Sequence, residues 1–299
     1  MRAAVIDVGS NSVRLLLMER MDPGGAVGER TVTVTGLRRG AGAGGRITDA
    51  ALSRLDACLA DYAARIVAAG SPPVASVGTA AVREAPNRAS IQAIARRRLG
   101  ADLEVIDGRR EAALSFAGAR LVLPPSGGPC RMIDIGGGST EVVAGDADGP
   151  RASVSLPLGV NRQGDGITGE PPDPREVQAI ADGARAMVGE ATREFGSAGL
   201  LVGVAGTVTT VAAVMRGGYD PVAIHGMRVG RDDVDVVLTR LARLAEAERA
   251  RTPGLHPDRV NVIVPGLAIL AGAMDALDDQ ELIVSERDIL DGIAISMGG

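Results

Sequence analysis

The chain has 299 residues, of which 45% are hydrophobic and 23% are charged, and its formal net charge is −5. These values are ordinary for a soluble globular protein, and the length leaves room for two domains. The negative charge argues against broad binding of nucleic acid, which needs a basic surface, although it is compatible with a local arginine-lined channel for a polyanion.

The cysteines and the apolar segments bear on the cellular compartment. Cys58 and Cys130 stand without CxxC or CxxH neighbours, which predicts a reducing compartment and neither a disulfide nor a zinc framework. The first apolar run is broken at Asp7 and lacks a signal-peptide cleavage site, and no apolar run reaches membrane-spanning length. We therefore expect a cytoplasmic protein that binds neither a membrane nor nucleic acid.

The first predicted elements are two strands joined by a polar turn. Residues 3–6 and 13–18 are apolar, and between them stand Asp7, Gly9 and the small polar residues 10–12. This order predicts strand, turn and strand, with a carboxylate at the end of the first strand.

The remainder of the first half alternates strands with helices. We expect strands at residues 30–35, 74–78 and 103–106, and helices at residues 52–66, 91–99 and 111–121. A Pro- and Gly-rich stretch at residues 123–129 predicts a boundary between an N-terminal domain, residues 1–123, and a C-terminal domain, residues 124–299.

A glycine-rich loop lies at residues 38–45. It matches GxGxxG, but no compact βαβ unit surrounds it, so it does not predict a dinucleotide site. Arg38, Arg39 and Arg46 of this loop either contact a passing phosphate chain or remain solvated; the sequence leaves both readings open.

The second half begins with the most informative stretch, residues 134–141, which read DIGGGSTE between two short apolar strands. Three glycines without Cβ atoms allow backbone N–H groups to close on an anion. Asp134 stands at the end of the incoming strand, where a carboxylate can hold a hydrated divalent cation. Two Asp-Gly-Ser/Thr hairpins half a chain apart predict a duplicated architecture that holds a phosphate chain between its halves.

Further strands and helices follow to the C-terminus. We expect strands at residues 152–156, 200–204 and 281–285, and helices at residues 175–195, 207–215, 232–249, 260–277 and 287–297. Gly206 and Thr207 form a third glycine turn at the end of a strand. The alternation predicts an α/β protein, and the adjacent strand pairs predict mixed rather than purely parallel sheets.

This constellation suits phosphoryl transfer to water, because carboxylates can hold Mg²⁺ while amides and hydroxyls hold phosphate oxygens. The reaction also needs a group that orients the water, and Glu111 begins a helix from which it can do so; the plain alternative is a helix N-terminal charge. There is no GxxxxGK[ST] motif, and His225 and His256 are the only histidines, so a P-loop or a Ser-His-Asp arrangement is not expected.

The motifs together resemble the exopolyphosphatase / guanosine pentaphosphate phosphohydrolase family of the actin-like ATPase superfamily. The chain is similar in length to short actinobacterial members, which end after two actin-like domains. The matching stretches are residues 7–12, 78–87, 108–112, 134–141, 157–159, 203–207, 264–270 and 285–292.

The resemblance implies two actin-like (ribonuclease H-like) domains, with mixed sheets flanked by helices and an active site in the interdomain cleft. It implies Mg²⁺, or alternatively Mn²⁺, as the cofactor, and a homodimer. Glu111 matches the catalytic glutamate that orients or deprotonates water, and Asp7, Asp134 and Glu141 match metal positions. The matching phosphate-binding positions are Ser10, Asn11, Ser12, Arg83, Gly136, Gly137, Gly138, Ser139, Thr140, Gly206 and Thr207.

One departure from the family pattern is Arg110, where many members carry a second glutamate; an arginine there attracts the carboxylate of Glu111 and weakens it as a base. The implied substrate is inorganic polyphosphate, with guanosine pentaphosphate (pppGpp), a signal of the stringent response, as the alternative. A non-catalytic sensor of guanosine tetra- or pentaphosphate and an actin-like kinase are the competing functions.

Overall fold

A computed structural model describes residues 2–41, 44–164, 166–196 and 199–298. The chain divides into two compact units, residues 1–118 with 289–299, and residues 119–288. Residues 42 and 43 of the predicted glycine-rich loop lie outside the described residues. Within the described ranges, no helix is both long enough and apolar enough to cross a membrane.

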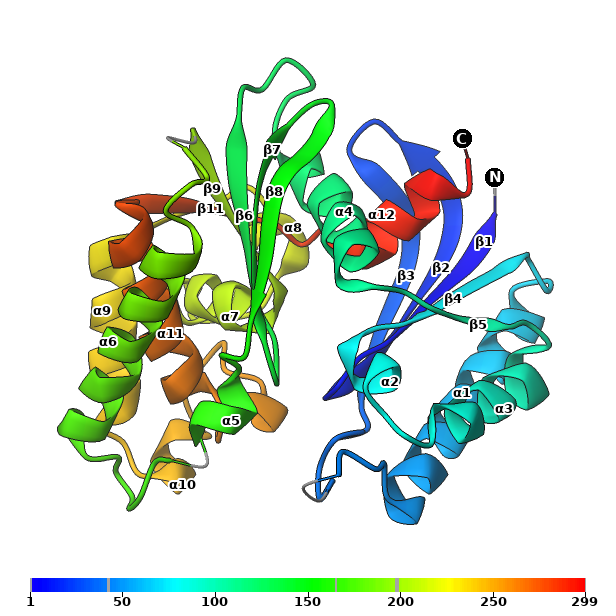
Figure 1. Ribbon diagram of the computed structural model, residues 1–299, viewed down its shortest axis with the longest axis horizontal. Coiled ribbons are helices and arrows are strands. Elements are labelled where there is room, and N and C mark those ends of the chain that lie inside the picture. Colours follow the sequence, from blue (N-terminus) through cyan, green and yellow to red (C-terminus); the bar gives the residue numbers. More distant parts are fainter. Residues whose placement is uncertain (1, 42–43, 165, 197–198, 299) are drawn as a thin grey trace. The chain divides into compact units, whose positions relative to one another are not determined.

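The first unit is a five-stranded mixed sheet with helices on both faces (Figure 1). The strand order is β3-β2-β1-β4-β5; β1 pairs antiparallel with β2 and parallel with β4. Its elements are β1 (Ala3–Val8), β2 (Ser12–Asp22), β3 (Gly25–Val34), α1 (Asp49–Ala68), β4 (Val74–Gly78), α2 (Ala80–Arg83), α3 (Arg88–Leu99), β5 (Leu103–Val105), α4 (Gly108–Ala119) and α12 (Ile289–Ser296).

The second unit repeats this architecture. Read from its edge, the order β8-β7-β6-β9-β11 has the same antiparallel and parallel pairings, and β10 adds antiparallel to β11. Its strands are β6 (Cys130–Ile135), β7 (Thr140–Asp146), β8 (Gly149–Leu156), β9 (Leu200–Val204), β10 (Arg228–Gly230) and β11 (Glu281–Val284). Its helices are η1 (Arg120–Val122), α5 (Val160–Gly164), α6 (Pro174–Ala191), α7 (Ala205–Arg216), α8 (Pro221–Ile224), α9 (Arg231–Ala242), α10 (Glu246–Arg249), η2 (Pro257–Arg259) and α11 (Ile263–Leu277). The predicted duplication and the mixed sheets are both present.

Aliphatic side chains build the core of each unit. In the first unit, one cluster lies between the sheet and helices α1 and α3, which run side by side, and a second cluster includes residues of α4 and α12 (Figure 1). In the second unit, a single larger cluster joins the sheet to α6, α7, α9 and α11. In β1, which is buried along its whole length, residues 3–6 belong alternately to the two clusters of the first unit, as expected of a strand in a sheet covered by helices on both faces.

The C-terminal helix α12 differs from the predicted division of the chain at residues 123 and 124, because it belongs to the first unit. Asp291 on α12 is fully buried and accepts hydrogen bonds from the Ala26 backbone N–H at 3.0 Å and from Arg30 Nη2 at 2.7 Å. A Cβ at Gly292 would overlap the backbone of Leu114, so α12 lies directly against α4. An apolar helix is compatible with either core, and only the packing decides between them.

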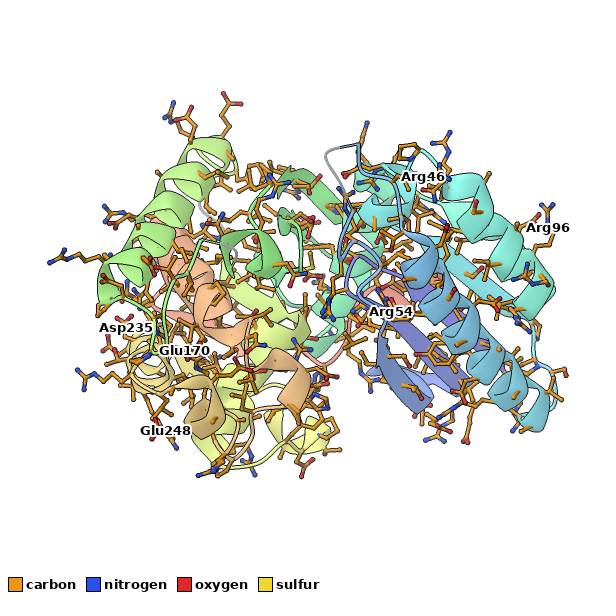
Figure 2. The ribbon with its side chains drawn as sticks, turned by 90° about the horizontal axis from the view of Figure 1, so that it is seen from below. Arg46, Arg54, Arg96, Glu170, Asp235 and Glu248 are labelled. Atoms are coloured by element: carbon orange, nitrogen blue, oxygen red, sulfur yellow. The ribbon has the colours of Figure 1, made fainter. Side chains whose placement is uncertain are left out.

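The predicted helix at residues 232–249 is broken into α9 and α10, which corrects that prediction. Arg249 is 2% exposed and donates to the carbonyl oxygens of Leu241 and Leu244 at 3.0 and 2.9 Å. Its side chain thus bonds to carbonyl groups at and just beyond the end of α9, where the regular helical hydrogen bonds stop. Glu170, marked in Figure 2, accepts from the Glu246 N–H at 2.7 Å and so caps α10.

Pro265 does not interrupt the predicted helix at residues 260–277, because α11 begins only at Ile263. A proline in the first helical turn removes no hydrogen bond, since the N–H groups there have no partner within the helix.

Candidate active site

The glycine turn of the second unit joins β6 to β7. Gly136 N–H donates to the Ser139 carbonyl at 2.9 Å and closes the turn. The backbone N–H groups of Val160 and Asn161, at the start of α5, donate to the carbonyls of Gly136 and Gly137 at 3.0 and 2.9 Å. The turn carbonyls are thus held by α5. The N–H groups of residues 137–139 donate to no group within the described part of the chain, which leaves them suited to an oxyanion.

Close packing of two backbone segments keeps this turn in place. A Cβ at Gly159 would overlap the backbone of Gly137 and Gly138, so only glycine permits the approach. Thr140 is fully buried, and its hydroxyl donates to the Leu158 carbonyl at 2.5 Å. Thr140, predicted to contact phosphate, therefore uses its side chain to fasten the turn to the segment before α5.

Beside the turn, three polar residues form a row across β6, β7 and β8. Asp134 lies opposite Glu141, and Glu141 lies opposite Ser155. Glu141 Oε1 accepts hydrogen bonds from Ser139 Oγ at 2.6 Å and from Ser155 Oγ at 2.7 Å. Two serine hydroxyls thus orient one carboxylate. The predicted phosphate ligand Ser139 spends its hydroxyl on Glu141, and Ser155 is a residue that sequence reasoning missed, because its place in the row depends on strand register.

The first unit carries the equivalent turn between β1 and β2. Gly9 N–H donates to the Ser12 carbonyl at 3.0 Å, as Gly136 does to Ser139. The carbonyl of Asn11 accepts from two backbone N–H groups of the loop after β3, and that of Ser10 accepts from the Arg38 N–H at 3.1 Å. Both turns are therefore held through their carbonyls. Ser10, Asn11 and Ser12 are half-buried.

Asp7 occupies the position that matches Asp134, but its surroundings differ. It is 1% exposed, and its Oδ2 accepts from Arg14 Nε at 2.9 Å and from Arg14 Nη2 at 2.7 Å. Arg14 stands opposite Asp7 in the sheet, as Glu141 stands opposite Asp134. A carboxylate that shares its charge with an arginine is a weaker metal ligand than the Asp134–Glu141 pair.

Two further predicted residues are brought together in the first unit. Arg83, the last residue of α2, donates from Nη1 to Glu111 Oε2 at 3.0 Å. Glu111 lies in the first turn of α4. Asp107, the residue before this helix, accepts a hydrogen bond from the Arg110 backbone N–H on its carboxylate at 2.7 Å. The side chain of Arg110 is exposed. Arg83, which contacts Glu111, stands 28 residues earlier in the chain.

The third turn connects β9 to α7, and here the structure adds an arginine that sequence reasoning missed. Ala205 has a left-handed φ of 61°, an uncommon conformation for a residue with a Cβ. A Cβ at Gly206 would overlap the guanidinium of Arg259, which comes from η2. Successive N–H groups at a helix start together with a guanidinium form a site suited to an anion. In the sequence, Gly206 indicated a close approach by another group, but it could not indicate that this group is Arg259.

Thr207 is 4% exposed, and a Cβ at Gly266 would lie 2.7 Å from its Oγ1. Its hydroxyl therefore faces α11, so Thr207 can contact a phosphate only through its backbone N–H.

The two carboxylates of the second unit suit a divalent cation that keeps water and substrate ligands, rather than a structural metal held entirely by protein side chains. Within the described residues, no three His, Cys, Asp or Glu side chains gather as a metal-binding group. Mg²⁺ commonly takes one or two carboxylates and completes its coordination with waters and substrate phosphates. Asp134 and Glu141, adjacent on two strands beside an anion-binding turn, match that requirement. Burial raises the pKa of both cysteine thiols, which disfavours Cys58 and Cys130 as ligands or nucleophiles.

Comparison with known proteins agrees with this geometry. Exopolyphosphatase 2 of Mycobacterium tuberculosis is 36% identical over 317 aligned positions, which cover 100% of this chain and 99% of that protein. The crystal structure of the Aquifex aeolicus member of the Ppx/GppA family superposes with a TM-score of 0.86 at 26% identity, covering 100% of this chain and 97% of that one. An exopolyphosphatase-like protein superposes at 0.89 with 30% identity, covering 100% and 99%.

These likenesses extend over both units, and they confirm the predicted actin-like fold. A family model described as the Ppx/GppA phosphatase family matches residues 5–298, nearly the whole sequence. This chain is a hydrolase and belongs to the Ppx/GppA phosphatase family.

Proposed function

We propose that the protein is a divalent-metal-dependent exopolyphosphatase that releases orthophosphate from the end of inorganic polyphosphate. The observation that carries the proposal is the row of Asp134, Glu141 and Ser155 beside the glycine turn, where the N–H groups of residues 137–139 donate to no group in the described part of the chain. The relatives named as exopolyphosphatases support it, since they match the chain from end to end.

In the proposed reaction, water attacks the terminal phosphorus, the bond to the bridging oxygen breaks, and the shortened polyphosphate leaves. Glu111 orients the water and accepts its proton on the carboxylate. The glycine turns and Arg83 bind phosphate oxygens. Asp134 and Glu141 would hold Mg²⁺ or Mn²⁺, which neutralises charge on the phosphates when bound. Asp7, paired with Arg14, is proposed to act through that arginine rather than as a direct ligand.

The distribution of arginines favours short chains, and it keeps pppGpp as the second candidate substrate. Long polyphosphate needs a continuous basic track, yet two arginines of the first unit are paired with nearby carboxylates. Arg38 pairs with Glu84 at 2.7 Å, and Arg96, which points away from α3 in Figure 2, pairs with Asp102 at 2.6 Å. The triphosphate of pppGpp ends in the same chemical group as a short polyphosphate.

Phosphate release measured with Mg²⁺ on tripolyphosphate, long-chain polyphosphate and pppGpp tests the proposal. We expect release from tripolyphosphate at the highest kcat/KM, with E111Q lowering kcat by about 10²–10⁴-fold while tripolyphosphate binding is retained. Release mainly from pppGpp would assign the protein to the second function. Binding of guanosine pentaphosphate without release from any substrate would instead identify a sensor. The proposed homodimer is checked by light scattering.

A further inference from the structure

We propose that Arg83 sets the position of Glu111 relative to the substrate, by holding the glutamate with one edge of its guanidinium and a phosphate with the other. The proposal rests on the proposed function, in which Glu111 orients the attacking water. It makes Arg83 a positioning residue for Glu111 in addition to a phosphate ligand.

The guanidinium is anchored to rigid backbone. Arg83 Nη1 donates to the Ile106 carbonyl at 2.9 Å and to Glu111 Oε2 at 3.0 Å. This nitrogen carries two hydrogens, and both are used. Ile106 is 2% exposed, and its N–H donates to the Gly78 carbonyl at 3.1 Å, which prolongs the pairing of β4 with β5. Glu111 is therefore tied, through one nitrogen, to the end of the central sheet.

The base of the Arg83 side chain is equally restrained. The backbone N–H of Arg83 donates to the Thr79 carbonyl at 3.0 Å in the turn of the short helix α2. A Cβ at Gly78 would approach Val82 Cβ to 2.9 Å, so the turn from β4 into α2 is tightly packed. With both ends held, the guanidinium has little freedom to follow a substrate, and Glu111 has little freedom to leave it.

The other edge of the guanidinium remains available to a ligand. Arg83 Nε and Nη2 donate to no group in the ranges that the structure describes, and the side chain is 29% exposed. These nitrogens form the planar fork that binds two oxygens of a phosphate. A phosphate held there shares one rigid plane with the carboxylate of Glu111, so the distance from the base to the phosphorus no longer depends on flexible side chains.

Replacing Arg83 by lysine separates positioning from simple attraction. R83K keeps the positive charge but has a single nitrogen, which cannot serve the Ile106 carbonyl, Glu111 and a phosphate in one plane. Because misplacing a catalytic group by about 1 Å lowers turnover by about 10²-fold, we expect kcat to fall by about that factor, while KM rises less than about tenfold. A residue that only binds phosphate would chiefly change KM.

A double-mutant cycle with E111Q provides the decisive measurement, because Glu111 and Arg83 are predicted to act as one unit. We expect R83K to lower kcat by less than about threefold in the E111Q background, while its effect on KM persists. Equal losses of kcat in both backgrounds would overturn the positioning role. R110K is the matched control, since Arg110 adjoins Glu111 in sequence but has an exposed side chain, and it should change kcat by less than about twofold.

Calorimetry separates failure of this inference from failure of the proposed function. Wild-type protein that releases no phosphate from any substrate overturns the proposed function, and the contact of Arg83 with phosphate is then judged by tripolyphosphate binding alone. We expect weaker binding for R83K, by less than about tenfold as for KM, and unchanged binding for R110K. Equal affinity of R83K and wild type would overturn the inference. Thermal melts exclude a variant that fails to fold.

Discussion

Asp134 and Glu141 lie directly opposite each other on β6 and β7, and the equivalent positions of the first unit, Asp7 and Arg14, lie opposite each other on β1 and β2. The duplicated hairpin thus holds two carboxylates in one unit and an ion pair in the other. Because Mg²⁺ commonly takes one or two carboxylates, the pair in the second unit is the one suited to a metal.

The first prediction concerns Ser155, which orients Glu141. Removing its hydroxyl in S155A should raise the Mg²⁺ concentration needed for half-maximal activity by about tenfold, because groups that orient metal ligands contribute about 10–100-fold to affinity. E141Q should lower Mg²⁺ affinity further. Manganese binding followed by electron paramagnetic resonance reports the same order without turnover. S153A is the control, since Ser153 lies on the same strand opposite Val143; equal effects of both serines would contradict the prediction.

The second prediction concerns the close approach of Arg259 to Gly206. G206A introduces a methyl group where the guanidinium now lies, and the flexible arginine can swing aside, so the free energy of unfolding should change by about 1 kcal/mol or less. The phosphate site loses its cation, so we expect KM for tripolyphosphate to rise by about tenfold, because a hydrogen bond to a charged group contributes about 1.5–3 kcal/mol.

Two further variants sharpen that experiment. R259A should reproduce the KM of G206A, and the double variant should be no worse than either, since both remove the same contact. G183A is the control, because a Cβ there meets nothing within 4 Å. Additive losses in KM would show that Gly206 and Arg259 act separately.

The third prediction is a dependence of stability on pH at Asp56. Arg98 and Arg97 of α3 hold the pKa of this α1 carboxyl well below its ordinary value. A lowered folded-state pKa contributes stability that is present above the unfolded pKa of 3.8 and is lost as pH falls through the folded pKa. Because the arginines are largely exposed, D56N should be less stable at pH 7 by only about 0.5–1 kcal/mol. Urea unfolding from pH 7 to pH 3 measures this difference, which should shrink below about pH 4; a constant difference would contradict the assignment.

The fourth prediction concerns the buried ion pair between Arg131 on β6 and Asp279 after α11, which are 2.9 Å apart. Each residue is 9% exposed. Removing one partner leaves a buried charge, so D279A should lower the free energy of unfolding by about 3–5 kcal/mol. The double variant R131M/D279L replaces the pair by apolar groups and should recover most of that loss. Denaturant unfolding compares the two, and a double variant as unstable as D279A would contradict the argument.

The hairpins could be predicted from sequence because their signals are local. An apolar run, an aspartate and glycines within ten residues determine a strand, its end and the turn that follows, since these depend on the backbone preferences of neighbouring residues. The same local signals predicted α11 in spite of Pro265. They failed at residues 243–245, where the break between α9 and α10 depends on side-chain contacts of Arg249 and of the distant Glu170.

The sequence by itself therefore determined the α/β class, the duplicated glycine turns and the aspartates beside them. Only the tertiary structure decided which residues distant in sequence come into contact: Arg83 with Glu111, Arg259 with Gly206, Ser155 with Glu141, and α12 with the first unit. The physical reason is that turn formation is set by torsional preferences of adjacent residues, whereas these contacts depend on strand register and helix packing, which sum many weak interactions across the whole core.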